Sequence, residues 1–210
     1  MDFRFGAGVS RRDGDKIGTL RGLIYDPTTQ QISAVVIDRT PMVERDVLAA
    51  IGTVDSADID QTYVELTPEQ VDALPDFMTE RNLAPPPDPS PDTGDEITDP
   101  VDVPDVPPVG AATGIESIAF TPIIQETFNI PGRDVVLDGN AELWATDGHI
   151  GNLKEVRVDD QTKRVAFVVA AEGLIFSHDV VAYGNQIDEI EPGRVVLNVG
   201  RQALEDQSRE

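Results

Sequence analysis

The chain repeats itself at a fixed spacing, and this internal similarity limits its fold more than any other feature of the sequence. Ile17-Gly18-Thr19-Leu20 corresponds to Ile150-Gly151-Asn152-Leu153, 133 positions further on. A duplicated small module is the simplest explanation. The same spacing relates Asp26 to Asp159, Thr29 to Thr162, Ile32 to Val165, Val35-Val36 to Val168-Val169 and Asp46-Val47 to Asp179-Val180.

Turn glycines upstream of these matches also recur. Asp13-Gly14 matches Asp147-Gly148 with one residue inserted, and Gly6 matches Gly139. Gly14, Gly148 and the glycines of the Ile-Gly-x-Leu motif sit where a tight turn or a sharp bend needs a residue without Cβ.

Each copy is predicted to contain short strands joined by turns. Residues 20–25 and 32–37 are rich in β-branched and apolar side chains, and a polar turn separates them, which indicates a β-hairpin. Residues 153–158 and 165–170 predict the same hairpin in the second copy. The apolar residues shared by the copies recur with the period of core strands and should be buried. They are Ile17, Ile150, Leu20, Leu153, Val35, Val168, Val36, Val169, Val47 and Val180.

A short helix is expected at the end of each copy. Thr67-Pro68-Glu69-Gln70 offers an N-cap, a proline at the first helical position and a Gln three residues after the cap. The second helix should cover residues 201–206, with Asn198 as its cap.

The stretch between the copies cannot form a core. Between Arg81 and Arg133 there is no basic residue, and residues 85–108 contain nine prolines and seven acidic residues. Like charges repel along such a segment, and proline favours extended conformations, so we expect a disordered acidic linker. A docking site for a basic partner is the alternative, because acidic tracts attract cationic surfaces.

An apolar run follows the acidic tract and has no counterpart before the first copy. Its large side chains should pack on one of the modules, or bridge the two, because exposing them would create an adhesive patch. They are Ile118, Phe120, Ile123, Ile124, Phe128 and Ile130. Four segments are therefore expected: a first module over 1–80, the linker over 81–116, an apolar connecting segment over 117–133 and a second module over 134–210.

Charge excludes some partners. Thirty-nine acidic and 16 basic residues give a formal net charge of -23. Binding to nucleic acid depends on Lys and Arg side chains that displace counterions, so direct nucleic-acid binding is disfavoured. Aspartate dominates the acidic residues and only three lysines are present, which fits either a salt-adapted surface or a codon bias toward arginine.

The absence of cysteine removes several kinds of chemistry. No disulfide, thiolate metal site or cysteine nucleophile can form. The N-terminus lacks the pattern of a signal peptide, and no stretch approaches the ~18 apolar residues that span a membrane. A cytoplasmic location is the expectation that follows.

Two patterns suggest catalytic or metal sites, and both have simpler interpretations. Ser177-His178-Asp179 contains the residue types of a hydrolytic triad, but neighbours on a strand point to opposite faces. Asp55, Asp58 and Asp60 could offer oxygens to a hard cation, yet the glycine that an EF-hand loop requires is missing. Surface positions and a solvated turn are favoured instead. We therefore expect no catalytic residues, no metal and no cofactor.

The order of motifs in each copy resembles a known family. A strand, an Asp-Gly turn, Ile-Gly-x-Leu, a hairpin ending in Val-Val and an Asp-Val strand follow one another over about residues 3–78 and again over 134–206. This order is similar to the PRC-barrel domain, a small β-barrel of the photosynthetic reaction-centre H subunit and of RimM-type ribosome-maturation factors. The resemblance implies a mainly β chain of two PRC-like barrels, and its turn glycines and core valines specify the fold rather than the function.

A binding role is what this resemblance implies. The H subunit carries an N-terminal membrane helix and RimM-type factors begin with a different barrel; this sequence shows neither pattern. We expect a non-catalytic module that binds and assembles with a partner protein. The alternatives are an accessory subunit of a membrane electron-transfer complex, associated peripherally, and a metal-dependent hydrolase, which is least favoured because no ligand set is visible.

The differences between the copies should mark the binding face, because the shared residues serve the fold. Residues 41–45 and 173–178 diverge and contain large apolar side chains. The candidate partner-binding residues are Met42, Val43, Leu174, Ile175 and Phe176. Trp144, the only tryptophan, is expected in the core, with an exposed docking anchor as the alternative.

Overall fold

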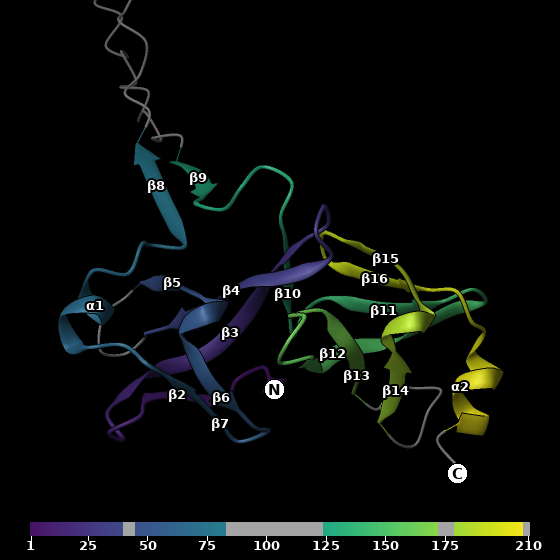
Figure 1. Cartoon of the computed structure of the whole chain (residues 1–210). Helices are drawn as coiled ribbons and strands as arrows, with labels where there is room; N and C mark the ends of the chain where they lie inside the picture. Colours follow the sequence, from purple (N-terminus) through teal and green to yellow (C-terminus); the bar gives the residue numbers. More distant parts are fainter. Residues whose placement is uncertain (40–44, 83–123, 172–178, 208–210) are drawn as a thin grey trace, which may run out of the picture. The chain divides into compact units, whose positions relative to one another are not determined.

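The computed structural model describes residues 1–39, 45–82, 124–171 and 179–207, and these residues form a mainly β chain (Figure 1). The mainly β prediction is therefore confirmed. The first half contains β1 (Asp2–Arg4), β2 (Gly8–Arg11), β3 (Lys16–Asp26), β4 (Gln31–Asp38), β5 (Asp46–Ala50), the 3-10 helix η1 (Ile51–Thr53), β6 (Val54–Ala57), β7 (Gln61–Val64) and α1 (Pro68–Asp72). The second half contains β10 (Val135–Asp138), β11 (Glu142–Ala145), β12 (Gly148–Val158), β13 (Val165–Ala170), β14 (Val180–Tyr183), η2 (Gly184–Gln186), β15 (Ile187–Glu191), β16 (Arg194–Leu197) and α2 (Arg201–Gln207).

The two halves have the same strand order. Strands follow one another as β5-β4-β3-β2-β7-β6 in the first half and as β14-β13-β12-β11-β16-β15 in the second. In both, one parallel pair (β2 with β7, β11 with β16) lies among antiparallel neighbours. Among the described residues no hydrogen-bonded pair joins the two ends of either sheet, so closure into a barrel stays a prediction. A separate two-stranded sheet consists of β8 (Met78–Asn82) and β9 (Ile124–Phe128).

The first strand of each half pairs with the sheet of the other half. β1 runs antiparallel to β12, with Phe3 opposite Val156, and β10 runs antiparallel to β3, with Leu137 opposite Leu23. Figure 1 shows β10 lying beside the long strand β3. This reciprocal strand exchange makes residues 1–79 and 127–210 one compact unit.

A continuous apolar core runs through both halves. Phe3 and Leu137, on the exchanged strands, have no exposed surface and belong to the same cluster as the core valines of β4 and β13. All ten shared apolar residues predicted to be buried are at most 8% exposed. That prediction is confirmed, and the exchange adds the reason why the two cores are joined.

The start of each half aligns with a spacing of 134 rather than 133. The Leu20 amide donates to the Ala7 carbonyl, and the Leu153 amide donates to the Ala141 carbonyl, both at 2.8 Å. Ala7 therefore corresponds to Ala141, and the predicted match of Gly6 with Gly139 is wrong by one residue. The extra residue lies in the first half, between the Asp-Gly turn and the Ile-Gly-x-Leu motif, where Asp15-Lys16 stands in place of His149 alone.

Backbone packing explains the glycine of the repeated Ile-Gly-x-Leu motif. A Cβ on Gly151 would lie 2.7 Å from the Ala171 carbonyl oxygen, and a Cβ on Gly18 would overlap the corresponding oxygen of Asp38. The other repeated glycines, Gly14 and Gly148, have positive φ in the Asp-Gly turns. Both roles predicted for these glycines are present.

The helix predictions are confirmed in one half and corrected in the other. Thr67 and Gln70 form the predicted capping box of α1. At the start of α2, however, the Arg201 amide donates to the Asp147 carboxylate at 2.9 Å, whereas the Asn198 side chain donates to the Asn185 carbonyl. The carboxylate that caps α2 thus comes from the distant Asp-Gly turn. Among the described residues no helix is long and apolar enough to cross a membrane.

A second, smaller cluster covers the outer face of the first sheet. Ile24, Val36 and Phe77 are buried in it, and Ile130 packs against them. The ring centres of Phe128 and Phe77 lie 5.2 Å apart, but Phe128 is 49% exposed. The prediction that the apolar connecting segment packs on a module therefore holds for Ile130, while Ile118, Phe120 and Ile123 lie outside the described residues.

A buried hydroxyl in one half and its apolar counterpart in the other allow a paired test of stability. Thr62 is fully buried, and its Oγ1 has no hydrogen-bond partner among the described residues; the corresponding Val195 is fully buried too. We expect Thr62→Val to raise the free energy of unfolding by about 1–2 kcal/mol and Val195→Thr to lower it by about 1–3 kcal/mol, because an unsatisfied buried hydroxyl keeps its desolvation penalty. Urea unfolding of both variants measures this. A loss of stability in Thr62→Val would show that the hydroxyl is satisfied.

Candidate functional site

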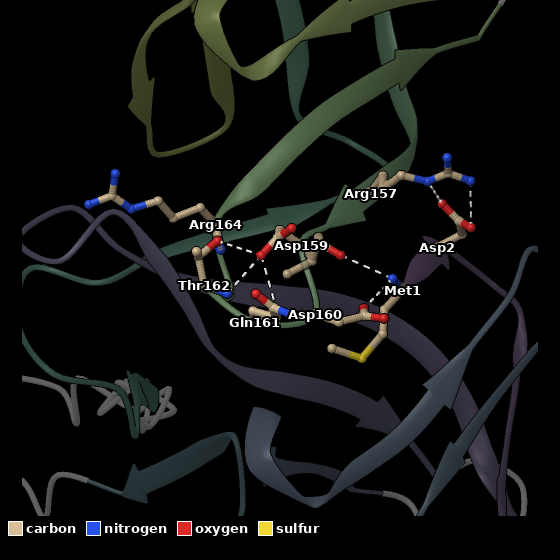
Figure 2. Close-up of polar contacts among 9 residues, drawn as sticks. Met1, Asp2, Arg157, Asp159, Asp160, Gln161, Thr162 and Arg164 are labelled. Carbon is tan, nitrogen blue, oxygen red and sulfur yellow. Dashed lines mark hydrogen bonds and ion pairs between the residues drawn. The ribbon is translucent and has the colours of Figure 1, made fainter.

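The turn between β12 and β13 holds the beginning of the chain (Figure 2). The Met1 amino group donates to the Val158 carbonyl at 3.0 Å and to the Asp160 carboxylate at 2.6 Å. The Asp2 carboxylate receives two bonds from the Arg157 guanidinium, one of them 2.6 Å long. These polar contacts fix the position of β1 on the second half.

The same turn has an internal network that recurs in the first half. The Asp159 carboxylate accepts bonds from the Thr162 amide at 2.7 Å and the Thr162 hydroxyl at 2.8 Å. These bonds lower the pKa of Asp159, and bonds from Thr29 and Thr28 lower the pKa of Asp26 in the same way. The repeated Asp and Thr are therefore turn residues, because they stabilise the hairpin bend in each half.

The tips of the two hairpin turns are used differently. Lys163 and Gln30 occupy corresponding positions with φ of +57° and +59°. The Lys163 carbonyl accepts a bond from the Ile32 amide at 2.8 Å, so this tip docks on β4 of the other half. Gln30 instead lines an open cleft against the second half. The departure from symmetry leaves a recess beside Gln30.

This junction cleft has a volume of about 660 Å³ and is lined by residues of both halves. Tyr25 and Gln30 come from the first half, and the start of β13, η2 and β15 supply the rest. β15 is the end strand of its sheet and pairs only with β16 among the described strands. The cleft thus exposes a strand edge, which is a surface to which an extended peptide can add.

Charged and hydroxyl groups border the cleft. Asp188 and Glu189 of β15 are exposed, and neither forms an ion pair in the described part of the chain. Arg164 also lines the cleft. Burial raises the pKa of Tyr25, and the nearby Arg164 partly opposes that rise, so the phenol stays protonated at neutral pH. The cleft therefore offers hydrogen-bonding groups and an acidic strand edge.

A row of charged and aromatic side chains continues from the cleft across the outer face of the second sheet. It crosses β1, β12, β13 and β14 at one register position and consists of Asp2, Arg157, Phe167 and Tyr183. The Arg157 guanidinium lies 4.6 Å from the Phe167 ring centre, and the Phe167 and Tyr183 rings meet edge to face at 6.3 Å. Tyr183 is 49% exposed and also lines the cleft. It connects the two surfaces.

The corresponding row of the first half is apolar and mostly covered. Val136, Ile24, Ala34 and Ala50 occupy the same register positions across β10, β3, β4 and β5. Phe77 and Ile130 pack in one cluster with Val136, Ile24 and Ala34, whereas Ala50 is exposed. Most of this row is thus covered by the chain itself in the first half, whereas in the second half the row presents Arg157, Phe167 and Tyr183.

The five partner-binding residues predicted from the sequence lie outside the described residues. Met42 and Val43 fall in 40–44, and Leu174, Ile175 and Phe176 fall in 172–178, as do Ser177 and His178. Asp179 is described, and its carboxylate pairs with Lys154, as that of Asp46 pairs with Arg21 in the first half. The last residue of the triad-like tripeptide therefore takes part in a cross-strand ion pair.

Other candidates have structural roles. Asp58 accepts bonds from the amides of Asp60 and Gln61, both at 2.9 Å, and Asp55 pairs with Arg12, as the solvated-turn interpretation predicts. No group of three or more potential metal ligands occurs in the described ranges.

Trp144 is half-buried. Its indole N–H donates to the Glu142 carboxylate at 2.8 Å, and the Arg194 guanidinium lies over its ring. It is neither a core residue nor a free anchor.

Sequence reasoning missed Tyr183, Phe167 and Tyr25. A signal for the first two was present, because Tyr183 corresponds to Ala50 and Phe167 to Ala34 at the spacing of 133. Large aromatic residues that replace alanine in one copy indicate a changed surface. Tyr25 corresponds to Val158, and only the position of the hairpins reveals its place in the cleft.

No protein-family model matches the chain. No curated protein matches it either.

Stability should be highest at mildly acidic pH. Burial raises the pKa of Asp46, Asp134 and Glu155, so their contribution is complete below the ordinary carboxyl pKa and is lost as pH rises through the raised values. Hydrogen bonds lower the pKa of four other carboxyls, whose contribution is lost only when pH falls through the lowered values; these are Asp26, Glu69, Asp147 and Asp159. Melting temperatures should rise from pH 7.5 to a maximum at roughly pH 4–5 and fall below it.

Glu155→Gln serves as the control for this pH dependence. It removes one of the carboxyls with a raised pKa, so the rise in melting temperature from pH 7.5 to pH 5 should be smaller in the variant. In the unmodified chain, a melting temperature that stays constant or falls from pH 7.5 to pH 5 would contradict the raised pKa values of these carboxyls.

Proposed function

We propose that the chain is a non-catalytic binding and assembly protein, built from two diverged PRC-barrel-like modules, that holds a segment of a partner protein in the junction cleft. The observation that carries this proposal is the divergence between the halves. Residues that build the core recur, whereas on the outer face Phe167 replaces Ala34 and Tyr183, which also lines the cleft, replaces Ala50. Exposed aromatic residues beside a concave surface are typical of binding hot spots.

Charge complementarity indicates the chemistry of the partner segment. The chain has a net charge of -23, and the strand edge in the cleft carries Asp188 and Glu189. A segment with Lys or Arg residues would be attracted to this edge and steered toward it. Addition to the β15 edge would supply main-chain hydrogen bonds, and Tyr183 would pack against an apolar or cationic side chain.

Paired capture experiments test this function. The tagged chain and two variants, Tyr183→Ala and Ile59→Ala, are used as baits in lysate of the native host, and captured proteins are purified and titrated. Ile59 is 46% exposed in the first half and so matches Tyr183 in exposure. We expect a partner whose affinity falls by about tenfold or more in Tyr183→Ala and is unchanged in Ile59→Ala.

The melting temperature of each variant separates binding from folding. Truncation of a half-exposed side chain should cost little stability, so Tyr183→Ala should unfold close to the unmodified chain. If no protein depends on Tyr183, or if both variants lose the partner equally, the cleft is not the binding site.

A further inference from the structure

The exchanged strands differ in chemistry, and each matches the sheet edge that receives it. On β1 the outward residues are Asp2 and Arg4, and they lie opposite Arg157 and Glu155 of β12. Both pairs place residues of opposite charge in register on neighbouring strands, and Asp2 with Arg157 forms a two-bond contact. The β12 edge therefore has a charge pattern that fits the charge pattern of β1.

On β10 the corresponding residues are Val136 and Asp138, and they lie opposite Ile24 and Gly22 of β3. Val136 packs against the cluster formed by Ile24 and its neighbours. A Cβ on Gly22 would lie 2.9 Å from the Leu137 carbonyl oxygen, so this strand approaches β3 closely. The β3 edge is thus apolar and sterically tight where the β12 edge is charged.

Interchanging the strands would produce mismatches at both edges. If β10 took the place of β1, Asp138 would lie opposite Glu155 and Val136 opposite Arg157, which joins like charges and leaves Arg157 without its carboxylate. If β1 took the place of β10, the Asp2 carboxylate would lie against Ile24, which is 1% exposed. Like charges on neighbouring strands and an unpaired carboxylate in an apolar site are both unfavourable.

We propose that these two edges form a specific recognition interface, in which each half binds one copy of the other half and excludes a second copy of itself. The partner that fits the edge of β12 is a half with a charged first strand of the β1 type. The partner that fits the edge of β3 is a half with an apolar first strand of the β10 type. The chain is then a covalently linked heterodimer, and this assignment is independent of the proposed cleft function.

Cutting the full chain tests the specificity. A protease site is placed within residues 85–112, the folded protein is cut, the mixture is unfolded in urea and refolded, and native mass spectrometry counts the complexes. We expect almost only the complex with one fragment of each kind. A statistical mixture, pairs of like fragments or separate fragments would overturn the proposal.

A charge-swap series in the uncut chain tests the specificity of the strand pairing even if the cut mixture does not refold. Arg157→Asp should lower the equilibrium constant for folding by at least about tenfold, because a second carboxylate would then face that of Asp2 across the two strands. Exchanging both residues, Asp2→Arg with Arg157→Asp, should restore most of this loss, since the pair is regained in reverse. If the double variant is no better than the single one, the pairing contributes no specificity. Arg12→Asp, which reverses a charge in an exposed ion pair away from the exchanged strands, is the control.

Discussion

Alanine at Gly18 is expected to destabilise the chain by roughly 3–5 kcal/mol, the range reached when a substitution forces a buried backbone apart. The new Cβ would overlap the Asp38 carbonyl oxygen, which belongs to the backbone and cannot rotate away. Ile17 and Leu20 on either side are buried, so β3 cannot shift without opening the core. Chemical denaturation of the variant measures the loss.

Two other glycines calibrate that result. Gly151→Ala places its Cβ 2.7 Å from the Ala171 carbonyl oxygen. It should lower the free energy of unfolding by less than Gly18→Ala does, although the motif is the same. Gly52→Ala has no heavy atom within 4 Å of its new Cβ and should change stability by less than about 1 kcal/mol. If all three variants were equally stable, close approach would not be the reason for the repeated glycine.

Truncation of Phe3 is expected to destabilise the second half by about 3–5 kcal/mol, although Phe3 belongs to the first half in sequence. Residues so near a chain terminus usually contribute little, because termini fray. Phe3 is different because it has no exposed surface and lies opposite Val156 in the second sheet. Fluorescence of Trp144, the only tryptophan, reports the unfolding of that half.

Phe3→Leu is the matched control for Phe3→Ala. Leucine fills the corresponding position in the other half, where Leu137 is fully buried, so this variant should lose only about 1 kcal/mol. A Trp144 transition that is unchanged in Phe3→Ala would mean that β1 does not pack on the second half.

Much of each half could be predicted from its sequence, because local patterns determine it. The hairpin from β3 to β4 follows from apolar runs around a polar turn, and the capping box of α1 follows from Thr67 and Gln70. The buried residues follow from the apolar positions shared by the copies. These features need only neighbours in sequence or within one sheet.

The strand exchange could not be predicted in the same way. β1 has three residues and β10 has four, so neither contains enough of a pattern to indicate which sheet it joins. The choice depends on contacts such as Asp2 with Arg157, which are 155 positions apart. The sequence repeat by itself suggests two self-contained modules, and only the whole chain shows that each half completes the other.

The candidate site depends on the same long-range arrangement. The cleft exists because the Gln30 turn of one half faces β15 of the other, and no local motif encodes that position. Tyr183 could have been noticed as a departure from Ala50 in the repeat. Its exposure and its place beside the cleft follow only from the structure.

Disulfide cross-linking tests the reciprocal strand exchange most directly, because the chain contains no cysteine. Asp2→Cys with Arg157→Cys places two thiols on directly opposite residues of β1 and β12, within the distance that a disulfide spans. Asp2→Cys with Ile24→Cys is the control, since these residues would be opposite each other if β1 paired with its own half. After mild oxidation and cutting within residues 85–112, we predict that the first pair holds the two fragments together on a non-reducing gel and that the second does not. Separate fragments from the first pair, with an internal disulfide in the second, would contradict the exchange.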